Sequence, residues 1–104
     1  MNEKLIDIRS LIPKMDLDNS GFLSFFDLQH LQVGILRLKP DELDTQEPHS
    51  LDEIYLVLEG DGFIEIGKKA YTVKKDLFIF VPAEVRHRFY GNTKEILVIY
   101  FFSD

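Results

Sequence analysis

Residues 44–60 of the chain read DTQEPHSLDEIYLVLEG, and this stretch decides the fold. Its apolar part, Ile54 to Leu58, is typical of a β-strand, and Gly60 begins a turn. Side chains two and four residues apart on an extended strand share one face, so His49 and Glu53 can face the same interior from the start of this strand. Such an interior requires a sheet that curls into a barrel or packs as a sandwich.

Residues 76–89, DLFIFVPAEVRHRF, form a second block, in which an apolar run of the buried-strand type precedes His87. The chain has three histidines, and two of them lie in these two blocks. His87 can join His49 and Glu53 from another strand if the sheet curls over. Two imidazoles and a carboxylate are a donor set for a first-row divalent metal. The metal hypothesis and the barrel hypothesis therefore test each other.

The rest of the chain shows short apolar runs separated by turn signals, a pattern that predicts an all-β sandwich or barrel. Apolar residues at helical spacing between Asn2 and Ile12 predict one short N-terminal helix, which Pro13 should end. We expect a single domain over residues 1–104, with the helix and a turn in residues 1–20 and the barrel in residues 22–104. The expected strands are 22–28, 31–38, 54–58, 63–66, 70–73, 77–81, 86–90 and 96–102.

Composition narrows the functional classes. The chain has 104 residues and a formal charge of −6 without a basic stripe, which argues against a nucleic-acid partner. It has no cysteine, which excludes disulfides and thiolate metal sites, and no apolar run long enough to span a membrane. The N-terminus lacks the apolar core of a signal peptide, so we expect a cytoplasmic protein.

The two blocks resemble the two motifs of the cupin superfamily, and the phrases DEIYLVLEGDG and VPAEVRHRF are typical of its small single-domain members. The resemblance covers about Leu31 to Phe102. It implies a jelly-roll barrel, also called a double-stranded β-helix, that holds one divalent metal near its mouth. His49, Glu53 and His87 occupy the ligand positions.

The fourth ligand departs from the family pattern. The first motif usually has two histidines with one residue between them, and here Glu47 stands at the first of these positions. Gln46 stands three residues before His49, as in a subgroup with a Gln-x-Pro-His pattern. Gln46, Glu47 and a water molecule are therefore the alternatives for the fourth position.

Three further departures replace glycines of the family pattern. Asp41 stands where the first motif opens with glycine, Asp76 stands at a usual glycine of the second motif, and Glu84 replaces the glycine after Pro82. The asparagine expected four residues after the second-motif histidine is Gly91.

Aromatic residues on the predicted strands are candidates for a substrate pocket, and the alternative is plain hydrophobic core. The candidates are Tyr55, Phe80, Phe89 and Tyr100. A competing motif, Asp16 to Asp27, matches much of an EF-hand calcium loop. We favour an ordinary turn there, because the sequence after it indicates strands and not the exiting helix of an EF-hand.

The residues and the resemblance together predict a small cupin that binds one divalent metal ion, Zn, Fe, Mn or Ni. We expect this protein to be a metalloenzyme that acts on a small organic molecule by dioxygenase-like or isomerase-like chemistry. The alternative is a non-catalytic module that binds or senses a small ligand, and a third hypothesis is an interaction protein with a vestigial site. Jelly rolls leave sheet edges and apolar faces to cover, so we also expect a homodimer with contacts at 96–102 and the N-terminal segment.

Overall fold

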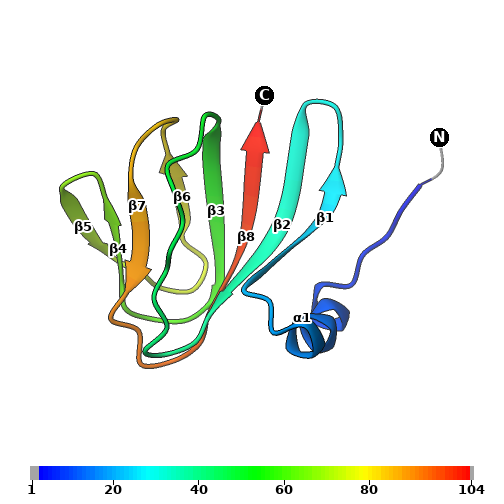
Figure 1. Cartoon of the computed structure of the whole chain (residues 1–104), viewed down its shortest axis with the longest axis horizontal. Helices are drawn as coiled ribbons and strands as arrows, with labels where there is room; N and C mark the ends of the chain where they lie inside the picture. The colour runs from blue at the N-terminus through cyan, green and yellow to red at the C-terminus, as the bar shows by residue number, and fades with distance from the viewer. Residues whose placement is uncertain (1–2, 104) are drawn as a thin grey trace.

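The computed structural model describes residues 3–103 and consists of two antiparallel sheets that face each other (Figure 1). The larger sheet has the strand order β1-β2-β8-β3-β6 and the smaller sheet the order β5-β4-β7. The strands are β1 (Phe22–Asp27), β2 (Leu31–Leu38), β3 (Asp52–Glu59), β4 (Phe63–Ile66), β5 (Lys69–Thr72), β6 (Phe78–Val81), β7 (His87–Tyr90) and β8 (Ile96–Ser103). All eight predicted strands are present, with ends displaced by at most two residues, and the all-β fold is confirmed.

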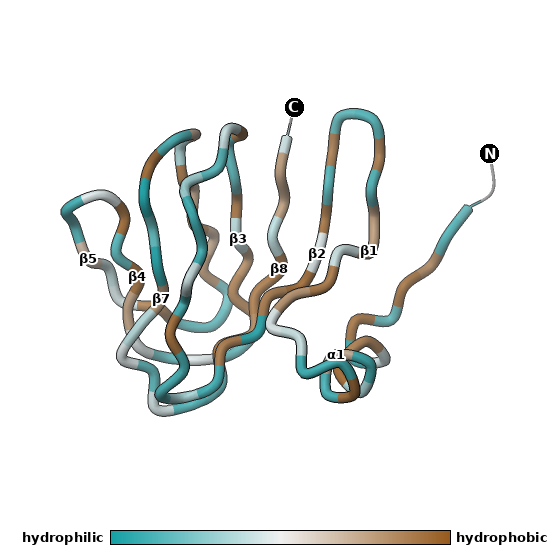
Figure 2. The backbone as a smooth tube through the Cα atoms, viewed as in Figure 1, coloured by the Kyte–Doolittle hydropathy of each residue, from teal (hydrophilic) through white to brown (hydrophobic). Residues whose placement is uncertain are grey.

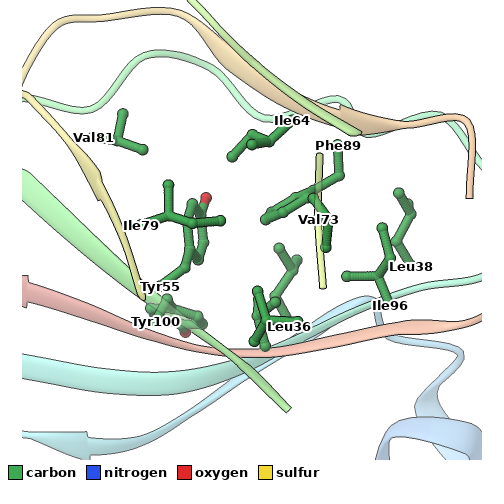
Figure 3. Close-up of a cluster of buried hydrophobic side chains, with 12 residues drawn as sticks. Leu36, Leu38, Tyr55, Ile64, Val73, Ile79, Val81, Phe89, Ile96 and Tyr100 are labelled. Carbon is green, nitrogen blue, oxygen red and sulfur yellow. The ribbon is translucent and has the colours of Figure 1, made fainter. Parts of the chain in front are cut away.

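The main core lies between the two sheets. Tyr55 and Val57 of β3 alternate with outward residues, as expected for side chains of period two. They pack with residues from β8, β4 and β7, among them Ile64 and Phe89 (Figure 3). Complete burial of one such aliphatic or aromatic side chain stabilises the fold by about 1.5–3 kcal/mol, so this core provides the rigid frame of the barrel.

A second core covers the outer face of the larger sheet. Leu11 and Met15 from the N-terminal region pack against Ile35 of β2 and Ile99 of β8. Alternate residues of β8 accordingly belong to the two cores, and hydrophobic residues predominate along this strand (Figure 2). The segment 96–102, which we expected at a dimer contact, is therefore a central strand with its outer face largely covered.

One short N-terminal helix within residues 1–20 is confirmed, but it begins later than the apolar spacing at residues 2–12 suggested. Residues 3–7 are not helical; a 3-10 helix occupies Ile8–Leu11, and α1 follows at Ile12–Asp18 (Asn2 lies outside the described residues). Pro13 lies in the first turn of α1 and does not end a helix. The N–H groups of that turn have no intrahelical acceptors, so a proline there loses no hydrogen bond. Asn19 ends the helix in the left-handed conformation, at φ 50°.

The calcium-like segment forms no EF-hand loop. Its first residues lie in α1, so the helix precedes the turn and β1 follows it. The Asp16 carboxylate is 2.5 Å from the Arg37 guanidinium on β2, an ion pair that joins α1 to the sheet. That calcium does not bind tightly here stays a prediction.

Three of the replaced glycines have a visible backbone consequence. Asp41, Asp76 and Glu84 have φ values of 67°, 70° and 69°, in the left-handed region that favours glycine. The N–H of Glu84 donates to the carbonyl of His49 at 2.6 Å, so this turn also supports the segment that carries His49.

Candidate metal centre

Three side chains, one from each sheet and one from the segment before β3, converge at one end of the barrel. His49 lies in the segment before β3, Glu53 is near the start of β3, and His87 begins β7. The Glu53 carboxylate oxygen is 3.2 Å from His87 Nε2 and 3.8 Å from His49 Nε2. One donor atom from each residue lies within 4.8 Å of the other two. Alternation on β3 and β7 directs Glu53 and His87 into the barrel, because both residues share a face with core residues.

The donor atoms are buried and have no hydrogen-bond partner. This holds for His49 Nε2, His87 Nε2 and Glu53 Oε1, and Glu53 is only 2% exposed. Glu53 and His87 lie at ion-pair distance, and this contact is a salt bridge only when His87 is protonated. Buried polar atoms are nearly always paired, and a divalent cation among the three would satisfy all of them at once. The residues therefore fit a metal ion.

Backbone contacts orient both imidazoles. His87 Nδ1 is 2.9 Å from the carbonyl of Val85 and donates to it, which leaves the Nε2 lone pair directed at the cluster. The His49 ring packs edge-on against Phe102, with ring centroids 4.7 Å apart. Such contacts outside the donor set fix the orientation that a metal ligand needs.

The electrostatics of the cluster favour a cation. Burial is the largest influence on His87 and lowers its pKa, but the Glu53 carboxylate, the Val85 carbonyl and the charge of Asp44 outweigh it, so the pKa of His87 is raised. Burial, aided by the charge of Glu53, raises the pKa of Tyr55 well above its usual value. The neighbourhood thus favours a proton or a metal ion on His87 and keeps Tyr55 neutral.

The two candidate fourth ligands lie in different places. The Gln46 carbonyl oxygen accepts from the Tyr55 hydroxyl at 3.1 Å, and its amide nitrogen donates to Asp44 at 3.0 Å. Gln46 thus lies beside the cluster with its amide already oriented by two partners. Glu47 is exposed and does not belong to the converging group.

Sequence reasoning missed Asp44, which fastens this segment to the barrel. Its carboxylate accepts from the backbone N–H of Phe89 on β7 at 2.8 Å, in addition to the Gln46 amide. The available signal was local: an Asp two residues before Gln46 suits an Asx turn, and the Gln46 N–H is 3.3 Å from Asp44 Oδ1.

A cavity of about 500 Å³ opens beside the cluster. His49 and Glu53 form part of its wall, together with Tyr100 and Phe102. A smaller cavity of about 260 Å³ lies beside His87, and Gln46 borders both cavities.

The aromatic pocket predictions have mixed outcomes. Tyr100 lines the larger cavity, whereas Tyr55 and Phe89 belong to the buried core beside the cluster. Phe80 was wrongly placed: it is 57% exposed on the outer face, opposite Ile54 in the β6–β3 register. The apolar run 77–81 suggested burial on both faces, but only Ile79 and Val81 of β6 point inward.

The two-sheet jelly roll thus carries two histidines and a glutamate at its mouth, a group that could hold a metal ion. Residues 34–103 match the cupin domain family, and the chain belongs to that family. Among the described residues, no helix is long and apolar enough to cross a membrane.

Related proteins agree with this assignment. An uncharacterised protein of Streptomyces coelicolor is 30% identical over 86 residues, which are 83% of this chain and 82% of that protein. A cupin superfamily protein of Desulfitobacterium hafniense has the same fold, with a TM-score of 0.70, 17% identity, and coverage of 79% of this chain and 74% of its own. A structure from a study of the DMSP lyases RdDddP and RnDddQII gives a TM-score of 0.73 at 18% identity, over 80% of this chain and 46% of that one.

Proposed function

We propose that this cupin holds one divalent transition metal through His49, Glu53 and His87 and acts as a metalloenzyme on a small organic molecule. The observation that carries the proposal is the set of three buried donor atoms that face one another without partners. Zn, Fe, Mn and Ni all accept imidazole and carboxylate donors.

A catalytic role is supported by the surroundings of the cluster. Three protein donors leave further coordination positions for substrate or water, as catalytic metal sites require. A bound metal would supply Lewis-acid or oxygen chemistry of the isomerase or dioxygenase kind. His49 and Glu53 border the 500 Å³ cavity, so a molecule in that cavity would meet the donor set directly. One similar barrel comes from a structural study of DMSP lyases, which supports the view that this fold can carry an enzyme.

The chain's own groups would position and shield the reactants. The Tyr55 hydroxyl donates to Gln46, and Gln46 donates to Asp44, so this chain of contacts holds the Gln46 amide beside the cluster. Tyr100 and Phe102 provide an apolar wall that limits access of water.

A non-catalytic binding or sensing module is the second candidate. Tyr55 favours it, because burial and the nearby charge of Glu53 raise its pKa and keep its proton in place, so it is a poor general base. A vestigial site fits less well, because all three donors are intact and oriented.

The test is elemental analysis with thermal melts of the wild type, His49→Ala, Glu53→Gln, His87→Ala and Gln46→Ala. Glu47→Ala is the matched control, since its side chain is exposed outside the cluster. We expect about one metal per wild-type chain and a metal-dependent rise in melting temperature, because metal binds the native state. The ligand variants should lose most of both, and Gln46→Ala less. Full metal content in His49→Ala and His87→Ala would refute the site. Turnover by the loaded protein separates the enzyme from the binding module.

A further inference from the structure

We propose that the ligand of this site is a compact, mainly apolar molecule that binds the metal through oxygen and carries no phosphate. This inference rests on the proposed function, because the metal is the anchor for the ligand oxygen. It goes further by stating which small molecules the cavity accepts and which it rejects.

The shape and lining of the larger cavity support an apolar ligand. Its volume of about 500 Å³ suits a small organic molecule. Its lining includes several large apolar side chains: Leu36 and Tyr100 are buried, and Phe22 and Leu43 are exposed to solvent. A ligand held at His49 and Glu53 would extend its remaining atoms along these apolar side chains.

The charges around the same cavity argue against a phosphate. The acidic side chains at its wall are Glu42, Asp44 and Glu53, and Arg37 is the one Lys or Arg residue among the described lining residues. Arg37 already pairs with Asp16 at 2.5 Å, and its side chain is buried in that contact. A divalent metal would just balance the charges of the lining. No cation is then left for a phosphate, which typically requires arginine or lysine partners.

The smaller cavity provides no alternative phosphate site. Its two arginines are both exposed: Arg86 directly precedes β7, and Arg88 lies on β7. Arg88 lies 3.5 Å from Glu65 and its guanidinium stacks over the Tyr90 ring at 4.6 Å. Glu47 and Glu65 share this cavity with the arginines, so its lining also lacks an excess of positive charge.

The experiment uses three probes with the same α-hydroxycarboxylate group and different remainders: lactate with a methyl, mandelate with a phenyl, and 3-phosphoglycerate with a phosphate. Each is titrated by calorimetry into the full chain after cobalt loading has been verified by elemental analysis. We expect mandelate to bind at least about tenfold more tightly than lactate, because the phenyl buries more apolar area. We expect 3-phosphoglycerate to bind more weakly than lactate. Tighter binding of 3-phosphoglycerate than of mandelate would overturn the inference.

A variant pair tests the charge argument directly. Leu43→Arg adds a cation at the mouth of the cavity, where Leu43 is 83% exposed, so the fold should tolerate it. We expect it to tighten 3-phosphoglycerate by about tenfold and to weaken mandelate. Leu5→Arg adds the same charge at a residue that is 90% exposed and does not line the cavity, and it should change neither affinity. An equal gain in both variants would refute a charge-selective cavity.

The two levels of the argument fail in different ways. If the protein loads cobalt and binds none of the three probes, the ligand class is refuted and the metal site stands. If the wild type does not load metal at all, the proposed function falls, and the ligand class falls with it.

Discussion

Acidification should weaken metal binding, and His87 sets the minimum size of the effect. A metal ligand must be a neutral imidazole, so every protonated histidine has to release its proton first. For an imidazole with an ordinary pKa of about 6.5, a change from pH 7.5 to 5.5 lowers the neutral fraction about tenfold. The structure raises the pKa of His87, mainly through Glu53, Val85 and Asp44 against the opposing effect of burial. His87 alone should therefore weaken the affinity by more than about tenfold.

The stability of the metal-free protein should change in the opposite direction. A raised pKa in the folded state means that protonated His87 stabilises the fold. This contribution is fully present below the unfolded pKa of about 6.5 and is lost as the pH rises through the higher folded value. The melting temperatures with and without metal should hence converge as the pH falls.

Calorimetric titration with Co²⁺ or Ni²⁺ at pH 7.5, 6.5 and 5.5, combined with thermal melts at the same pH values, measures both effects. The exposed-residue variant Glu47→Ala should show the same pH dependence as the wild type. Constant metal affinity across this range would refute His87 as a ligand.

Three further predictions concern the frame. Glu84→Gly should stabilise the protein by about 1 kcal/mol, because it removes a side chain from a residue with left-handed φ. The control Glu47→Gly, at a residue without positive φ, should not stabilise it. Chemical denaturation compares the two variants, and equal midpoints would contradict the strain argument. Gly34→Ala would place a methyl 2.1 Å from the Tyr100 ring, so we expect the ring to be displaced. The melting temperature should fall and ligand binding should weaken. An unchanged melting temperature and ligand affinity would contradict this prediction. We also expect a homodimer whose contact includes the exposed outer face of β6; light scattering should show dissociation in Phe78→Glu, and a monomeric wild type would disprove it.

The strands could be predicted because their physical signals are local. Apolar residues of period two and turn residues between them fix where a strand begins and ends, and β3 shows this in its alternate burial. The position of α1 could not be read in the same way. Its apolar residues pack against β2 and β8, and that tertiary contact determines which turn is helical. Pro13 is compatible with either end of a helix, so the sequence alone left the wrong choice open.

The site was predictable only in its donor residues. Strand parity brought Glu53 and His87 to one face, and the motif spacing added His49. The roles of Gln46 and Asp44 depend on how residues 39–51 cross the barrel, for which the sequence has no periodic signal. The exposure of Phe80 was equally hidden, since an edge strand with apolar residues on both faces resembles a fully buried strand.

The segment 44–47 acts as a partition between the two cavities, with Gln46 bordering both. An ion held at the cluster would therefore face two different cavities. The larger one contains His49 and the apolar side chain of Phe102, and in the smaller one His87 lies among charged residues. An organic molecule and a water-borne partner, such as a proton or a small polar reactant, could approach it from different directions without competing for the same entrance. Because Asp44 ties this partition to β7, a change in that one contact would alter both approaches together.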